Sequence, residues 1–310
     1  MLGTVNAMLE SLDNFIWGLP LIVLILATGI LLTVRLRGLQ IRHLGKALRY
    51  IFHNEEDGEG EVTSFGALCT ALSATIGTGN IVGCATAIVA GGPGAMFWMW
   101  IAALFGMATK YTEGMLAVKY RQIDEEGHAL GGPFYYIEKG MGRNWRWLAK
   151  IFSVFGVMVG LFGIGTFTQV NGITSAVNNF FDPNNTNTVS LFGREYSWSI
   201  VIAGIILTIC VGLVVIGGIK RISKVSEIVV PFMAVTYIAV CLIIVFTHLT
   251  ELPNAFMEIV RSAFGLRAAA GGALGAMMVA MQKGIARGIF SNEAGLGSAP
   301  IAAAAAQTKE

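Results

Sequence analysis

The sequence has few charged residues. Asp, Glu, Lys and Arg make up 13% of its 310 residues, and the formal net charge is only +2. Soluble domains typically carry about 25% charged residues, so this deficit argues against an ordinary soluble domain. The small net charge also provides no broad positive field of the kind that attracts nucleic acid. The 55% share of hydrophobic residues indicates a membrane protein instead.

Motifs for metal binding and catalysis are also missing. The four cysteines and four histidines are scattered, with no C-x-x-C pair, so the sequence predicts neither a zinc site nor a disulfide framework. The patterns G-x-S-x-G, H-E-x-x-H and the P-loop are absent, and we therefore expect no enzyme and no cofactor. The N-terminus lacks the basic region of a signal peptide and carries Glu10 and Asp13 instead, so we expect no signal peptide.

Long apolar runs repeat along the chain. Each of the first six is near the roughly 20 residues that cross the apolar core of a bilayer. We expect these runs to be helical, because lipid cannot satisfy open backbone groups. The seven predicted membrane segments are 15–34, 64–90, 94–118, 151–177, 198–218, 225–247 and one that starts near residue 268.

Lys and Arg are concentrated in alternate loops. The loops after the first, third and fifth segments carry five, six and three of them, whereas the other loops carry only Arg194 and Arg261. Because positive loops stay in the cytoplasm, the sequence predicts an external N-terminus and a cytoplasmic chain end. The acidic stretch HNEEDGEGE (53–61) is then a cytoplasmic loop, which we expect to be solvated.

The octet SATIGTGN (73–80) interrupts the second segment with polar and small residues. Gly77 and Gly79 favour unwinding, since each glycine costs a helix about 1 kcal/mol relative to alanine. Unwinding frees carbonyls for a cation and exposes helix amides that attract a carboxylate, as in the midplane sites of secondary transporters. The alternative is close helix packing through the G-x-x-x-G pair Gly79 and Gly83.

A second glycine-rich stretch, AAAGGALGAMMVAMQKG (268–284), begins the seventh segment. The second and seventh segments start on opposite sides of the membrane, as an inverted five-helix repeat requires. We therefore predict a matching helix break in this stretch. Tight packing of a Gly- and Ala-rich helix remains the alternative.

The fourth segment contributes GIGTFTQVNG (163–172), in which Gln169 lies near the middle of a span. A buried amide needs a partner, so Gln169 either pairs with another helix or contacts a ligand, and Phe167 is core or pocket wall. We place no charge at mid-membrane. Lys110 and Glu113 are expected to snorkel or pair at the inner end of the third segment. This lack of a carboxylate relay favours sodium over protons as the coupling ion.

Four stretches occur in a fixed order: SATIGTGNIVG (73–83), GGPGAMFWMW (91–100), GGPFYYIEKGMG (131–142) and GIARGIFSNEAGLGSAPIAAAAAQT (284–308). Together they resemble the alanine or glycine:cation symporter family, over nearly the whole chain from about residue 15. The resemblance implies an all-α polytopic membrane protein with the leucine-transporter-type fold, which has inverted five-helix repeats behind one extra N-terminal helix.

Mapped onto this chain, the resemblance implies one transporter domain over 1–310. The parts are the extra helix (15–34), the first repeat (62–247) and the start of a second repeat (264–310). Members of the family have eleven membrane helices, so about four would follow Glu310. The resemblance therefore implies a chain truncated after about seven helices, which would need a complementary fragment or be inactive alone.

The resemblance also implies sodium-coupled uptake of alanine or glycine through the plasma membrane, the inner membrane of a prokaryote. An ion-conducting channel is the alternative, since broken helices also line filters. The implied substrate-binding residues are Thr75, Gly77, Thr78, Gly79, Phe167, Gln169, Gly272, Gly275 and Met278. The implied sodium ligands are the carbonyls of Ser73, Thr75 and Ile76 and the side chain of Asn80.

Overall fold

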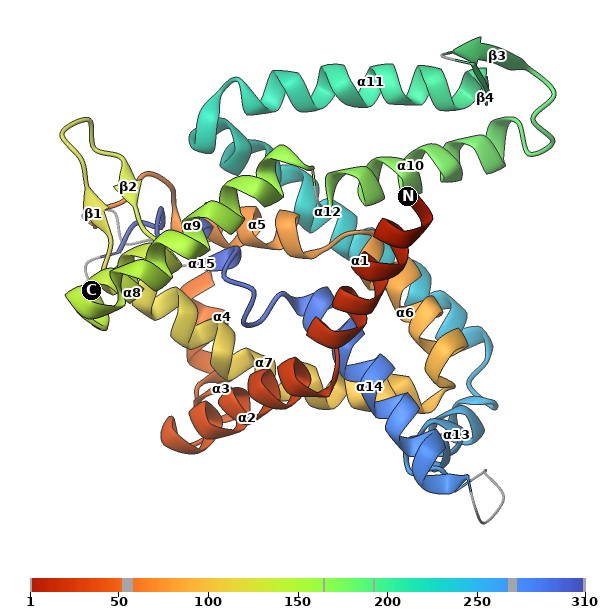
Figure 1. Ribbon diagram of the computed structural model, residues 1–310, viewed down its shortest axis with the longest axis horizontal. Coiled ribbons are helices and arrows are strands. Elements are labelled where there is room, and N and C mark those ends of the chain that lie inside the picture. Colours follow the sequence, from red (N-terminus) through yellow and green to blue (C-terminus); the bar gives the residue numbers. More distant parts are fainter. Residues whose placement is uncertain (1, 52–57, 164, 192, 267–271, 309–310) are drawn as a thin grey trace.

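The computed structural model describes residues 2–51, 58–163, 165–191, 193–266 and 272–308, which are mostly helical (Figure 1). The helices are α1 (Leu2–Ile16), α2 (Leu19–Arg35), α3 (Leu39–Arg42), α4 (Leu44–Ile51), α5 (Ser64–Thr75), α6 (Thr78–Gly91), α7 (Gly94–Lys119), α8 (Pro133–Gly140), η1 (Arg143–Trp145), α9 (Arg146–Leu161), α10 (Thr166–Phe181), α11 (Trp198–Val215), α12 (Gly218–Thr247), α13 (Leu252–Ala263), α14 (Ala273–Asn292) and α15 (Ala299–Ala303). Two antiparallel hairpins, β1 (Gln122–Ile123) with β2 (Ala129–Leu130) and β3 (Thr188–Leu191) with β4 (Arg194–Ser197), lie in loops.

Several of these helices are long and apolar enough to cross a membrane. Among the described residues they are α11, α12 and the stretch Arg143–Phe181, together with the pair α5 and α6, which is bent by 41°. The apolar helix α2 is shorter, with 17 residues. These helices support a membrane location. The inverted repeat and its boundaries stay a prediction.

The fourth predicted segment is not one continuous helix. α9 ends at Leu161 and α10 starts at Thr166, with a turn between them. Gly163 and Gly165 have φ values of 61° and 89° in this turn, in the left-handed region that other residues rarely adopt. Gly163 and Gly165 therefore divide the segment, and the prediction of one unbroken helix over 151–177 is wrong.

α7 packs against α2, α13, α14 and α15, and α14 crosses it in the lower half of the view (Figure 1). The contact is made by small residues: a Cβ on Gly284 would collide with the backbone of Ala95, and one on Gly288 would lie 3.0 Å from Cβ of Ala102. Small residues let membrane helices approach closely, so that dispersion forces hold them together. This packing fixes which face of α14 points away from α7.

The acidic loop is only partly as expected. Residues 52–57 lie outside the described part, but Glu61 is packed rather than solvated, with a side chain only 7% exposed. Its Oε1 accepts the Ala129 N–H at 2.8 Å, and its Oε2 lies 3.0 Å from Nδ1 of His128. The expectation of a solvated stretch is wrong here because both carboxylate oxygens hold the β1–β2 hairpin. Beside it, the Arg121 guanidinium binds backbone carbonyls of Glu59 and Ala304.

The contact between Glu61 and His128 predicts a pH-dependent stability. The hydrogen bond to Glu61, and then the negative charge of Glu61, raise the pKa of His128 above its ordinary value of 6.5. A raised pKa in the folded state stabilises the fold below about pH 6.5, and this contribution is lost as pH rises through the higher folded pKa. We expect His128→Gln to flatten the fall in thermal midpoint of the detergent-solubilised chain above about pH 6.5.

His43→Gln is the matched control for this measurement and should leave the pH profile unchanged. Equal pH profiles for the original chain and His128→Gln would contradict the assignment.

Candidate functional site: two facing helix breaks

The octet forms the helix break that its glycines predict. α5 ends at Thr75 and α6 starts at Thr78, with Ile76 and Gly77 extended between them. The Gly77 N–H donates to Oδ1 of Asn80 at 2.9 Å, which caps α6. Among the described residues, no N–H reaches the carbonyls of Ser73, Thr75 or Ile76. These three oxygens are therefore free acceptors at the break.

Gln169 of α10 is the residue that closes one side of the break. Its Oε1 accepts the Thr78 N–H at 2.9 Å, and a Cβ on Gly77 would collide with its amide. Three residues further along α10, a Cβ on Gly172 would lie 2.6 Å from Cγ2 of Thr78. Positions i and i+3 share a helix face, so α10 meets the break through one face. The predicted proximity of Gln169 to Gly77 and Thr78 is present.

Two polar groups at the start of α6 have no partner in the described part of the chain. Oγ1 of Thr78 is buried without a hydrogen bond, and the Gly79 N–H reaches no backbone acceptor. An unsatisfied buried polar group costs about 1–3 kcal/mol, so these groups are suited to a polar ligand. A Cβ on Gly83 would meet open space, which gives no support to close packing through the G-x-x-x-G pair.

The second break is not where the sequence predicted it. α14 runs without interruption from Ala273 through Gly275 and Met278 to Asn292, and residues 267–271 lie outside the described part. At about 1.5 Å per residue, Met278 lies roughly 20 Å along the axis from Ser291. The expected site residues Gly272, Gly275 and Met278 are therefore not brought to the octet.

The chain breaks instead after Asn292. Glu293, Gly295 and Gly297 have φ values of 54°, 85° and 78°, and this left-handed turn leads into α15. A left-handed glutamate is uncommon and costs of order 1–3 kcal/mol. The sequence feature that could have predicted this break is SNEAGLGS (291–298), in which two glycines follow polar residues.

The two breaks lie against each other. Nδ2 of Asn80 donates to the carbonyl and to Oγ of Ser291, at 3.2 and 2.8 Å. Oγ1 of Thr75 donates to the Ala71 carbonyl at 2.9 Å and lies 3.4 Å from Oε2 of Glu293, and Oγ of Ser298 donates to that same carboxylate oxygen at 3.0 Å. A carboxylate therefore does stand at the octet. The prediction that no charge lies at mid-span is wrong, because the turn after α14 returns Glu293 to the break.

α7 holds the second break through two charged residues. Nζ of Lys110 donates to the Asn292 carbonyl at 3.1 Å, at the negative end of the α14 dipole. Oε2 of Glu113 accepts the Gly295 N–H at 3.3 Å. The expectation that Lys110 and Glu113 snorkel or pair with each other is therefore corrected. Both satisfy backbone groups that the turn leaves unpaired.

Two further expected residues contribute less directly. Phe167 is 73% exposed, and its ring lies over Gly163 at the turn before α10. The Ser73 hydroxyl donates to the Thr70 carbonyl at 2.7 Å within α5, so only its carbonyl faces the break. The described site thus offers amide and hydroxyl donors on one side and carbonyl and carboxylate oxygens on the other.

Comparison with known proteins gives a family match. The family model described as the sodium:alanine symporter family matches residues 2–310. An uncharacterized transporter of Haemophilus influenzae is 54% identical over 308 residues, covering 99% of this chain and 64% of the relative. The sodium/alanine symporter AgcS of Methanococcus maripaludis is 46% identical over 306 residues, covering 97% and 63%. The probable sodium/glutamine symporter GlnT of Bacillus subtilis is 42% identical over 298 residues, covering 96% and 58%.

The close approach of α10 to α6 gives a stability prediction. We expect Gly172→Ala to destabilise the protein by about 1–3 kcal/mol, as overpacking does, because the added methyl group would overlap the Thr78 side chain. Thermal unfolding in detergent measures this effect. Gly156→Ala is the control, since a Cβ there meets open space. A Gly172→Ala protein as stable as Gly156→Ala would show that the helices are further apart.

Proposed function

The chain belongs to the sodium:alanine symporter family, and we propose that it couples sodium entry to the uptake of a small neutral amino acid, alanine or glycine. The family is one of transporters, so the protein is not an enzyme. The chain spans less than two thirds of the length of the relatives described above. The transport activity proposed here is therefore that of the whole transporter. The proposal rests on the contact between the two helix breaks, which places amide and hydroxyl donors on one side and carbonyl and carboxylate oxygens on the other.

The amino-acid carboxylate binds at the start of α6. The Gly79 N–H and the Thr78 hydroxyl are unpartnered there, and the positive end of the α6 dipole points at them. Gln169 forms the neighbouring wall and exchanges hydrogen bonds with the ligand. Gly77 is required because any side chain would fill this space. Recognition through backbone groups is independent of the substrate side chain, which fits relatives named for alanine and for glutamine.

The sodium ion binds at the end of α5. Within the described residues, the carbonyls of Ser73, Thr75 and Ile76 accept no backbone hydrogen bond there, and the Glu293 carboxylate adds a negative charge beside Thr75. Oxygen ligands of this kind suit a hard cation. The Asn80 amide oxygen accepts the Gly77 N–H and its NH2 group donates to Ser291, so Asn80 braces the two breaks rather than serving as a principal ligand.

When the sodium ion and the carboxylate bind side by side, the attraction between their charges raises the affinity of the site for each. This mutual gain in affinity is the thermodynamic basis of coupling. One charge moving through about 100 mV releases about 2.3 kcal/mol. At about 1.36 kcal/mol per tenfold, this potential alone supports roughly fifty-fold accumulation of the amino acid.

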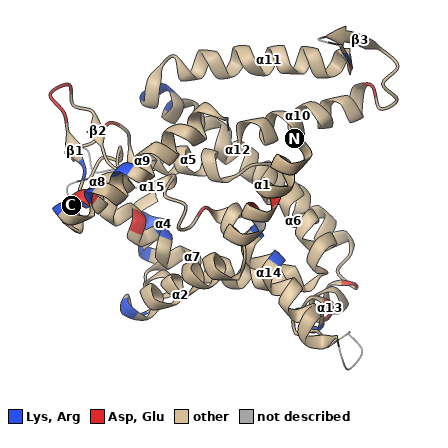
Figure 2. Cartoon of the chain, in the orientation of Figure 1, with Lys and Arg blue, Asp and Glu red and all other residues tan. Residues whose placement is uncertain are grey.

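The proposed orientation has an external N-terminus and a cytoplasmic chain end. Lys and Arg gather toward the left of the view, at the end of α2, around α4 and α8 and at the turn between α11 and α12, while the β3–β4 hairpin lies toward the right (Figure 2). A one-sided distribution of this kind supports the assignment of the left side to the cytoplasm.

Uptake of labelled alanine into proteoliposomes with an inward sodium gradient tests this function. We expect accumulation that disappears when potassium replaces sodium. Gln169→Ala should raise the half-saturating alanine concentration about fivefold or more, since a lost hydrogen bond to a buried or charged group costs about 1–3 kcal/mol. Gln122→Ala, on the exposed β1 strand, is the control and should behave like the original chain.

Alanine binding to the detergent-solubilised chain provides a second readout of the same site. Sodium-dependent binding without uptake would leave the binding site in place and assign the remaining transport steps to further helices. Alanine binding that is equal in sodium and potassium would refute the proposal.

A further inference from the structure

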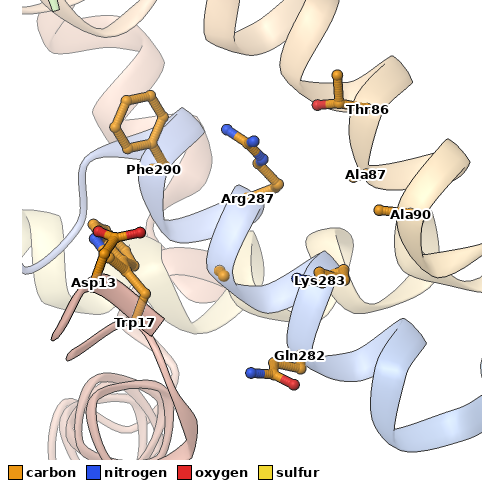
Figure 3. A pocket seen from close by; sticks show the side chains of 10 residues that line it. Asp13, Trp17, Thr86, Ala87, Ala90, Gln282, Lys283, Arg287 and Phe290 are labelled. Carbon is orange, nitrogen blue, oxygen red and sulfur yellow. The ribbon is translucent and has the colours of Figure 1, made fainter. Parts of the chain in front are cut away.

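A second cavity lies beside the facing breaks, between α1, α6 and α14 (Figure 3). Its volume is about 340 Å³, within the ~300–1,000 Å³ typical of small-molecule pockets. It is lined by Asp13, Trp17, Thr86, Ala87, Ala90, Gln282, Lys283, Ala286, Arg287 and Phe290. None of these residues belongs to the octet or to the turn after Asn292.

Two cationic side chains, both exposed, line the cavity. Lys283 and Arg287 are one turn apart on α14, so their side chains leave the helix on the same face. Within the described residues, neither forms an ion pair. Ionisable residues in membrane helices are rare, usually face a water-filled cavity and mark substrate or ion pathways. Two unpaired cations on one cavity wall therefore indicate a site for an anionic group.

Packing fixes the face of α14 from which these side chains leave. The opposite face of α14 carries Gly284 and Gly288, which lie against the backbone of α7. On the cavity side, a Cβ added to Gly91 would lie 3.0 Å from the Cβ of Lys283. The end of α6 therefore packs on the base of the Lys283 side chain. In Figure 3 the Arg287 guanidinium extends from α14 into the space between Phe290 and the Thr86 side of α6.

An acidic group faces the cations from another element. Asp13 belongs to α1, and Figure 3 places it beside Trp17, across the cavity from Thr86 and Ala90. Within the described residues, Asp13 also forms no ion pair. The cavity therefore presents separate positive and negative groups, the arrangement that matches a zwitterion.

The cavity adjoins the octet through a single ring. Phe290 lines the cavity, and its ring lies 3.5 Å from the position of a Cβ on Gly79. The Trp17 ring meets Phe290 edge-on, with centroids 6.3 Å apart. Thr86 and Ala90 lie on the part of α6 that leads away from the break, toward the external side in the proposed orientation. A solute that enters from outside therefore passes the cavity before the octet.

We propose that this cavity is an outer binding site for the amino-acid zwitterion on its way to the octet. Arg287 holds the carboxylate through its planar pair of donors, Lys283 adds a second positive charge, and Asp13 receives the ammonium group. This inference rests on the proposed uptake function. It assigns to Lys283, Arg287 and Asp13 a selection for solutes that carry both charges.

Thiol labelling of the full chain tests the site without altering its charged residues. Ala90→Cys places a thiol on the cavity wall, and the unmodified chain, with its own four cysteines, supplies the background. We expect a negatively charged methanethiosulfonate to react about tenfold faster than a positively charged one, because clefts of one sign concentrate opposite charge. Alanine should slow the reaction, and alaninamide, which lacks the carboxylate, should not.

Labelling in potassium separates this proposal from the proposed function. Protection by alanine should persist in potassium, because the outer site contains no sodium ligand. Protection in potassium, in a chain that shows neither sodium-dependent uptake nor any sodium-dependent part of its alanine binding, would refute the function and keep the site. Labelling that is unaffected by alanine would overturn the site even where uptake is intact.

Arg287 variants provide the second readout. Arg287→Gln should abolish the preference for the negative reagent and the protection by alanine, and Arg287→Lys should restore part of both. If Arg287→Gln does not fold, protection in the Ala90→Cys chain decides the question. A folded Arg287→Gln chain with unchanged protection would show that Arg287 has another partner and would overturn the assignment.

Discussion

The hydrogen bonds between Asn80 and Ser291 are the contact on which the rest of the site depends. Unwound backbone within a membrane is tolerated only where the protein or an enclosed cavity satisfies it. Asn80 meets this requirement for both breaks, because it accepts the Gly77 N–H and donates to Ser291. Packing of α14 on α7 and the contacts of Lys110 and Glu113 hold the second break in place, and the Asn80 bridge joins it to the first.

α14 connects the parts of the molecule that the proposals concern. One face packs its glycines against α7, the other carries Lys283 and Arg287 into the outer cavity, and its C-terminal end supplies the second break. Lys110 and Glu113 then attach that break to α7. The outer cavity, the Phe290 ring and the octet therefore follow one another along a single helix, which makes α14 the structural link between capture and binding.

The sequence predicted the first break because local chemistry decides it, whereas the place of Gln169 beside the break was implied only by the family resemblance. Two glycines weaken a helix wherever they stand, and a buried amide needs a partner. The second break was misplaced because Gly272 and Gly275 are tolerated at the start of a helix, whereas the turn at Glu293 depends on contacts from α7. Glu61 was misread for the same reason: its partner His128 is distant in sequence. Local composition does not reveal which distant residue forms a hydrogen bond with an exposed backbone or carboxylate group.

The central claim is that sodium and the amino acid bind next to each other at the facing breaks. The most direct test is the affinity of the purified chain for radioactive sodium, measured with and without alanine. Linkage requires alanine to raise the sodium affinity by the same factor by which sodium raises the alanine affinity. We predict a rise of about fivefold or more, the lower end of typical coupling. A sodium affinity that is unchanged by alanine would contradict the account.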